Sequence, residues 1–150
     1  MLSENPTGRK VFELIVGIYL KSERLAKQEL KTLGVTFSQF RAMMVLSQKD
    51  NITQREFADI IETDTTTVMV ICDSLEKKGW LRRVSDATDR RVNRLVLTDS
   101  GRNVFTQALP LIQVKYEYFL RKISVDELKV AIPVLENIYR NIKECLQQRG

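Results

Sequence analysis

The sequence contains no histidine among its 150 residues, and it has only two cysteines, Cys72 and Cys145. The lack of histidine excludes Ser–His and Cys–His nucleophilic catalysis and every imidazole metal site. Two thiolates are too few for a cysteine-only zinc site, and they provide no disulfide framework. The six glycines lie far apart, so the chain has no phosphate-cradling loop. We therefore predict that the chain is not an enzyme and that it carries no metal and no cofactor.

Long hydrophobic runs are also missing. The longest uninterrupted apolar run, residues 130–135, covers about six residues, whereas a membrane-spanning helix needs roughly 20. The opening residues, Met1 to Pro6, lack the basic stretch of an export signal. We expect no membrane association and a cytoplasmic location.

Positive charge is concentrated in one short stretch. Residues 77–94 hold seven Lys or Arg against two Asp, which gives this stretch a net charge of +5. The whole chain also has a net charge of +5, because the remaining residues carry 17 basic and 17 acidic side chains. A focal basic region predicts contact with a dense polyanion such as nucleic acid.

Helical periodicity begins near the N-terminus. Apolar side chains recur at helical spacing over residues 9–33, and Gly34 supplies the residue that helices favour just past their end. Thr36 and Gln39 then form the pattern of a capping box. The helix that they open is expected to bury Phe37, Phe40, Met43, Met44 and Leu46.

Two short helices follow, separated by a turn of only a few residues. Thr53 and Glu56 form a second capping box, which opens the first of these helices. Thr63 and Asp64 are suitable N-caps for the second helix, and Gly79 ends it. Its core positions are expected to be Val68, Ile71, Cys72 and Leu75. The pattern predicts a helix-turn-helix.

After Gly79 the pattern changes from helical to strand-like. Residues 80–84 and 94–98 are strand candidates, and the polar segment 85–93 between them predicts a hairpin with a charged tip. We call this hairpin the wing, and we expect Trp80 to anchor its root in the core.

Two further helices are predicted after the wing. Residues 98–100 cap the first of them, and a third capping box, Ser124 with Glu127, opens the second. Pro110 and Pro133 lie inside these helices and are expected to kink them. The last helix carries an apolar stripe that consists of Leu128, Ile132, Leu135, Ile138, Tyr139, Ile142 and Leu146.

These elements predict a mainly α fold with a small β-hairpin wing, in a single domain of residues 1–150. Within it, residues 36–100 form a winged helix-turn-helix lobe that is large enough for its own core. The helices over residues 9–33 and 101–148 carry apolar stripes that this lobe does not need. We expect them to be dimerisation helices that bury their stripes against a second copy in a homodimer.

The second helix of a helix-turn-helix places its N-terminal part in the major groove. Here that part begins with Asp64 and residues 65–67, three threonines whose hydroxyls can bond phosphates or base edges, or can simply cap the helix. Met69 and Val70 are expected to face outward and read thymine methyl groups; packing inside the protein is the alternative. This helix contains no Arg or Lys before Lys77, so its front cannot read guanine through arginine. We therefore expect DNA shape to supply much of the specificity.

The wing suits the minor groove. The tip reads Asp89-Arg90-Arg91, which can place a guanidinium in a narrow minor groove while the aspartate fixes the arginine rotamer. On the adjoining strands Arg82, Arg83 and Arg94 concentrate the charge, and an ordinary solvated charge cluster is the alternative. The predicted DNA-binding residues are Thr53, Gln54, Asp64, Thr65, Thr66, Thr67, Met69, Val70, Lys77, Arg82, Asp89, Arg90, Arg91 and Arg94. Thr53 and Gln54 would contact a phosphate from a helix N-terminus, although capping explains them equally well.

These residues resemble the MarR family of winged-helix regulators over most of the chain. The resemblance is sharpest over residues 36–101 and most specific over residues 75–101. It rests on Phe37–Phe40, Thr53–Gln54, Phe57–Ala58, Ser74–Leu81, Asp89–Arg91 and Leu97–Gly101.

The resemblance implies a dimer with interlocked terminal helices that binds double-stranded DNA at a pseudo-palindromic operator. It also implies transcriptional repression, often relieved by a small aromatic or phenolic anion. Arg91, oriented by Asp89, matches the family's wing position for the minor groove, whereas Met69 and Val70 depart from the polar residues more usual in its recognition helix. A ligand pocket near Ile15, Tyr19, Met43 and Met44 is a hypothesis from geometry alone, with a core role for these residues as the alternative.

Two other functions are weighed against DNA binding from the residues alone. The winged helix could serve protein–protein contact without DNA, with the threonine-rich helix front as the docking face. A small hydrolase that uses Asp86 and Asp89 is excluded, because arginines around these carboxylates at a flexible tip would hold their pKa values low.

Overall fold

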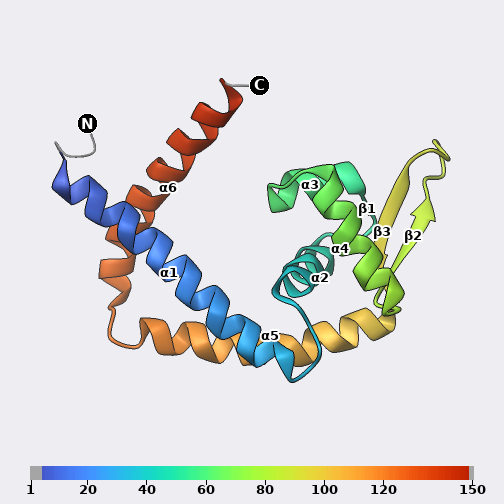
Figure 1. The fold of residues 1–150 in the computed structure, drawn as a ribbon, viewed down its shortest axis with the longest axis horizontal. Helices are drawn as coiled ribbons and strands as arrows, with labels where there is room; N and C mark the ends of the chain where they lie inside the picture. Colours follow the sequence, from blue (N-terminus) through green and yellow to red (C-terminus); the bar gives the residue numbers. More distant parts are fainter. Residues whose placement is uncertain (1–4, 149–150) are drawn as a thin grey trace. The chain divides into compact units, whose positions relative to one another are not determined.

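The computed structural model describes residues 5–148 (Figure 1). Along this part of the chain the elements are α1 (Pro6–Lys31), α2 (Phe37–Gln48), β1 (Ile52–Thr53), α3 (Gln54–Ile61), α4 (Thr65–Lys77), β2 (Leu81–Ser85), β3 (Asn93–Leu97), α5 (Asp99–Leu120) and α6 (Val125–Gln147). Contacts divide the chain into two compact units, Met1–Gln113 and Val114–Gly150. Helix α5 begins in the first unit and ends in the second.

The helices begin where local side chains supply the missing hydrogen-bond partners. All three predicted capping boxes form: Thr36 with Gln39, Thr53 with Glu56, and Ser124 with Glu127. Asp64 caps α4, with its carboxylate accepting from the backbone N–H of Thr67 at 2.8 Å. Because each cap satisfies backbone donors that a helix start leaves open, the boundaries follow from the sequence.

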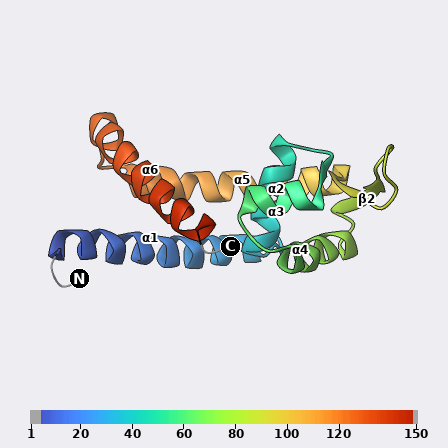
Figure 2. The same cartoon turned by 90° about the horizontal axis from the view of Figure 1, so that it is seen from above.

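The wing belongs to a three-stranded antiparallel sheet in the order β1-β3-β2. Strand β1, which was not predicted, pairs Ile52 with Leu95. In the hairpin itself Leu81 lies opposite Leu97. The leucines of β2 and β3 are buried, so one face of the sheet joins the core while the wing projects outward (Figures 1 and 2).

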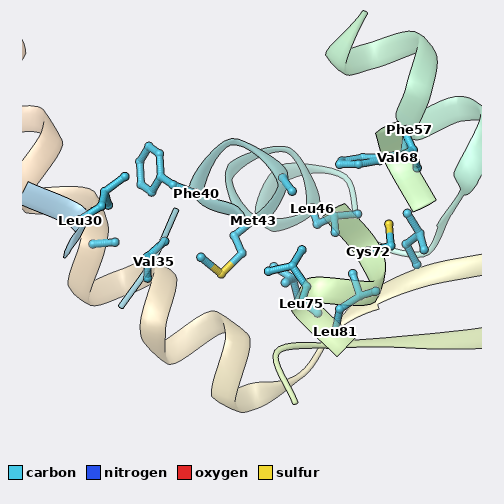
Figure 3. Packing of buried hydrophobic residues seen from close by; sticks show 14 of the residues in the cluster. Leu30, Val35, Phe40, Met43, Leu46, Phe57, Val68, Cys72, Leu75 and Leu81 are labelled. Atoms are coloured by element: carbon cyan, nitrogen blue, oxygen red, sulfur yellow. The ribbon is translucent and has the colours of Figure 1, made fainter. Parts of the chain in front are cut away.

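The core of the first unit gathers side chains from most of its elements (Figure 3). Val68, Cys72 and Leu75 are fully buried, as predicted, and Ile71 packs against them partly buried. Trp80 is also partly buried against this core, which confirms it as the anchor at the root of the wing. The fully buried set also includes Leu30, Met43, Leu46, Phe57 and Leu95.

The first unit is larger than the predicted lobe of residues 36–100. Ala26 and Leu30 of α1 and Ala108 and Ile112 of α5 lie in the same core, because these helices supply apolar side chains that the winged part packs against. The C-terminal end of α1 and the beginning of α5 therefore support the wing and α4.

One sequence expectation needs adjustment. Met44 was predicted to be buried, but it is 37% exposed, because the buried face of α2 runs through Phe40, Met43 and Leu46 and turns the next position outward. Pro110 and Pro133 lie inside α5 and α6, which continue as helices past both positions, and the kinks stay a prediction.

Large apolar side chains remain exposed on α1 and α6. On α1 they include Phe12, Leu14, Ile18 and Tyr19. On α6 they include Ile132, Leu135, Tyr139, Ile142 and Leu146, and none of the residues of this helix is buried. None of the helices within residues 5–148 is both long and apolar enough to cross a bilayer.

Candidate nucleic-acid interface

The exposed front of α4 lies opposite its buried face. Thr66, Val70, Asp73 and Lys77 recur at helical spacing on this side, and all four are exposed. Val68, Cys72 and Leu75 hold the other side of the helix in the core. Packing therefore fixes which side chains α4 presents to a partner.

Asp64 and Thr67 are occupied with capping. The Thr67 hydroxyl donates to the Asp64 carboxylate at 2.7 Å, in addition to the bond from its backbone N–H. These bonds lower the pKa of Asp64, chiefly because the Thr67 backbone N–H stabilises the carboxylate. Of the predicted contacts here, Thr65 and Thr66 are exposed residues, while Asp64 and Thr67 set the start of the helix.

Met69 and Val70 face solvent. Their exposed fractions are 53% and 65%, so the alternative that they pack inside the chain does not hold. Two apolar side chains thus lie among polar ones on the outward face of α4.

Asp86 organises the tip of the wing. Its Oδ1 accepts hydrogen bonds from the backbone N–H groups of Thr88 at 2.7 Å and Asp89 at 3.0 Å, and from the Thr88 hydroxyl. Its Oδ2 accepts from Arg94 Nε. The Thr88 hydroxyl and then Arg94 hold the pKa of Asp86 well below its usual range. The sequence had suggested a flexible tip, but this buried carboxylate ties the turn together.

The tip then presents its arginines. The carboxylate of Asp89 accepts from the backbone N–H of Arg91 at 2.9 Å, so it orders the turn through the main chain. Arg90 and Arg91 are both exposed. The wing follows α4 directly in the chain, and in Figure 1 the two elements diverge from their common junction.

Arg94 supports the wing from within. Besides its ion pair with Asp86, it donates from Nη1 to the carbonyl of Asn51 at 2.8 Å. Because its guanidinium is engaged between the wing and the segment before β1, we assign Arg94 to support of the wing rather than to DNA.

Arg83 joins the wing to α4. It forms ion pairs with Asp73 at 2.6 Å and with Glu76 at 2.5 Å. Burial lowers the pKa of Arg83, but the hydrogen bond that it donates to Asp73 and the charge of Glu76 outweigh this effect and raise the pKa overall. Sequence reasoning missed this role, because the three residues look like separate surface charges until α4 and β2 pack together.

Fewer basic side chains of residues 77–94 are available to a partner than the sequence suggests, because Arg83 and Arg94 are paired within the protein. Lys78 is also engaged: it donates to the carbonyl of Gly34 and lies over the ring of Trp80. Apart from Lys78, the exposed basic residues of the stretch are Lys77, Arg82, Arg90 and Arg91. The Thr53 hydroxyl accepts from Glu56 N–H in its capping box, and Gln54 beside it is half-buried.

The predicted ligand-pocket residues do not share one environment. Met43 is fully buried in the core, whereas Tyr19 and Met44 are exposed, and Ile15 is half-buried on α1. A groove of about 420 Å³ lies where α1 meets α2, and its lining runs from Glu23 to Ser38 without any of the four. We therefore assign Met43 to the core.

Comparison with known proteins shows what this chain is similar to. The model of the protein family described as the MarR family matches residues 33–92 of this chain. An HTH-type transcriptional regulator of Bacillus subtilis, YpoP, is 27% identical over 114 residues, which are 76% of this chain and 73% of that protein.

Solved structures share the fold over nearly the whole chain. The transcriptional regulator SlyA superposes with a TM-score of 0.86 at 23% identity and covers 93% of this chain and 99% of its own. A mutant of MarR from E. coli, solved in complex with operator DNA, is 25% identical and superposes with a TM-score of 0.80. The match covers 91% of this chain and 96% of the MarR chain. The fold, the matched segment over α2 to the wing, and these relatives agree with the resemblance found in the sequence, and the winged helix-turn-helix of this chain is similar to that of the MarR family of transcriptional regulators.

Proposed function

We propose that this protein binds double-stranded operator DNA as a homodimer and represses transcription of the adjacent genes. In this proposal the front of α4 enters the major groove, and the wing places Arg91, with Arg90 beside it, against the adjacent minor groove. The observation that carries the proposal is the wing tip: the buried Asp86 carboxylate holds a turn from which two exposed arginines project, on a hairpin that Arg83 joins to α4 through its ion pairs with Asp73 and Glu76.

Charge and homology support a nucleic-acid partner. Lys77, Arg82, Arg90 and Arg91 are exposed within one segment of 18 residues, 77–94, which favours a polyanion over a neutral surface. The E. coli MarR relative, solved with operator DNA, has the same fold over 91% of this chain.

The exposed stripes on α1 and α6 support the dimer. Soluble monomers rarely leave such rows of large apolar side chains uncovered, so a second copy is the partner that accounts for them. A two-fold dimer carries two wings and two copies of α4, which explains why the operator would be pseudo-palindromic.

Relief of repression by a small aromatic or phenolic anion completes the proposal. Its support is the similarity to the MarR family, and its test is a titration of the protein–DNA complex with a panel of aromatic carboxylates and phenols. Release of DNA at a concentration that leaves the fold intact would support an effector, and unchanged binding across the panel would contradict this part.

The first experiment is a gel shift at fixed salt with the DNA upstream of the protein's own coding region. Arg91→Ala should weaken binding by about 1–3 kcal/mol if the guanidinium lies in a groove. Arg24→Ala is the matched control, because it removes an exposed arginine from α1, outside both α4 and the wing. Wild-type affinity should also fall steeply with salt, since each neutralised phosphate releases about 0.9 counterion.

The outcomes separate the alternatives. Equal affinities for Arg91→Ala and the wild type would contradict the wing assignment. No shift at low salt, with this fragment or with fragments selected from random DNA, would favour a winged helix used for protein–protein contact.

A further inference from the structure

The outward face of α4 carries an unusual set of side chains for a helix that reads DNA. Its first eight residues, 65–72, contain no charged side chain, and the exposed ones among them are Thr65, Thr66, Thr67, Met69 and Val70. The Thr67 hydroxyl is bonded to Asp64. Two threonine hydroxyls and two apolar side chains are therefore available for contact with base edges.

This composition limits what the helix can recognise. Bidentate recognition of guanine needs Arg or Lys, and that of adenine needs Asn or Gln; neither pair of residue types occurs in residues 65–72. The first charged residue on the face, Asp73, is held by Arg83. The apolar feature that a base pair exposes in the major groove is the C5 methyl group of thymine.

We propose that Met69 and Val70 are specificity-determining residues that read thymine methyl groups in the operator. The inference rests on the proposed function and adds the chemistry of the recognised sequence: thymines under the first two turns of α4. The arginines of the wing then attract the protein to the DNA backbone and minor groove, while Met69 and Val70 determine which sequence the dimer binds.

A partner protein is a poorer match for the same two side chains. Docking faces on proteins are contiguous apolar patches of a few hundred Å² or more. Met69 and Val70 are instead bordered by Thr65, Thr66 and Asp73 on the exposed side of α4. An apolar pair that has polar neighbours along α4 fits methyl groups that are themselves surrounded by polar base edges.

The test replaces thymine by deoxyuridine in a bound operator fragment, one position at a time. This change removes only the C5 methyl group and keeps every hydrogen-bonding group of the base. We expect one or two positions in each half-site at which affinity falls about fourfold, the factor for one buried methyl-sized group. Thymines outside the protected region serve as matched control positions.

The protein variants assign the effect to side chains. Met69→Ala and Val70→Ala should bind more weakly, and each should lose its sensitivity to deoxyuridine at the position that it contacts. Arg91→Ala should bind more weakly but keep the full sensitivity, because its contact lies in the other groove. A urea unfolding curve for each variant shows that the fold is intact.

The results distinguish the two proposals. Wild-type protein that binds the thymine and deoxyuridine duplexes equally at every position would overturn the methyl readout and leave the proposed DNA binding standing. Sensitivity that persists in both alanine variants would also overturn it. Failure to bind any duplex would remove the proposed function itself.

Discussion

Gly101 lies directly against the backbone carbonyl of Trp80. A Cβ atom built on Gly101 would lie 2.9 Å from the carbonyl carbon of Trp80 and closer still to its oxygen. The same carbonyl accepts a hydrogen bond from the backbone N–H of Thr98 at 3.1 Å, and the Thr98 hydroxyl donates to the carbonyl of Gly79 at 2.7 Å. The first turn of α5 is thus fixed to the root of the wing, and only a residue without a side chain fits there.

Gly101→Ala should therefore destabilise the protein by about 1–3 kcal/mol, the usual range for forcing extra atoms into a packed site. The neighbouring substitution Ser100→Ala is the control, because Ser100 is exposed and should change stability by less than about 0.5 kcal/mol. Urea denaturation of the two variants measures the difference. Equal midpoints for Gly101→Ala and wild type would contradict the close approach.

Asp86 should control the order of the wing without touching DNA. Asp86→Asn removes the charge that pairs with Arg94 and weakens the bonds to Thr88 and Asp89, so the tip should loosen. We expect trypsin to cleave after Arg90 and Arg91 several-fold faster in this variant at pH 7, and DNA affinity to fall with it. Asp59→Asn, an exposed carboxylate on α3, is the charge-matched control. Identical cleavage in the two variants would show that Asp86 does not organise the turn.

The same carboxylate predicts a pH dependence. Its pKa is lowered in the folded protein, so its stabilising effect is fully present above the ordinary carboxyl pKa of about 3.9 and is lost as the pH falls below it. NMR signals of the Thr88 and Asp89 amides should therefore stay constant from pH 8 to pH 5 and change only in more acidic solution. A transition near neutral pH would contradict this assignment.

The starts of the helices could be predicted because capping is local. Thr36 with Gln39 and Ser124 with Glu127 act within four consecutive residues, so the sequence alone carries the signal. Strand β1 could not be predicted, because it is two residues long and exists only through pairing with β3. A strand that short has no periodicity of its own.

The candidate site was only partly visible in the sequence for the same reason. The outward position of Met69 and Val70 follows from the spacing of Val68, Cys72 and Leu75, which is local to α4. The roles of Arg83 and Arg94 depend on partners that packing brings together from other elements. A count of basic residues treats every Lys and Arg as available to DNA. In the structure Arg83 and Arg94 instead pair with carboxylates of the protein itself.

Cys72 should be protected from thiol reagents by the fold. Burial raises the pKa of its thiol to about 11, so its thiolate fraction at pH 8 is roughly two orders of magnitude below that of an ordinary cysteine. In the Cys145→Ser variant, which removes the exposed thiol, labelling of Cys72 should be slow and should become fast in urea. Rapid labelling of this variant under native conditions would contradict the burial.

The raised pKa also gives the sign of an alkaline effect. The neutral thiol is favoured in the folded protein, so the stabilisation is present below the ordinary thiol pKa and is lost as the pH rises toward 11. The Cys72→Ala variant should therefore lose less stability than wild type between pH 8 and pH 10.5, which urea denaturation at each pH measures. An equal loss in both would assign the alkaline effect to other groups.

The stripe on α6 provides the sharpest test of the homodimer. Ile132, Leu135, Tyr139, Ile142 and Leu146 recur at alternating spacings of three and four residues, the pattern of helices that pack against one another. Ile142→Glu should convert the dimer to a monomer, because burial of an isoleucine is worth about 1.5–3 kcal/mol and a two-fold dimer loses it twice. Asn141→Glu adds the same charge outside the stripe and should leave the dimer intact. Sedimentation equilibrium measures both, and a wild-type chain that sediments as a monomer at micromolar concentration would contradict the dimer and, with it, the two-fold operator.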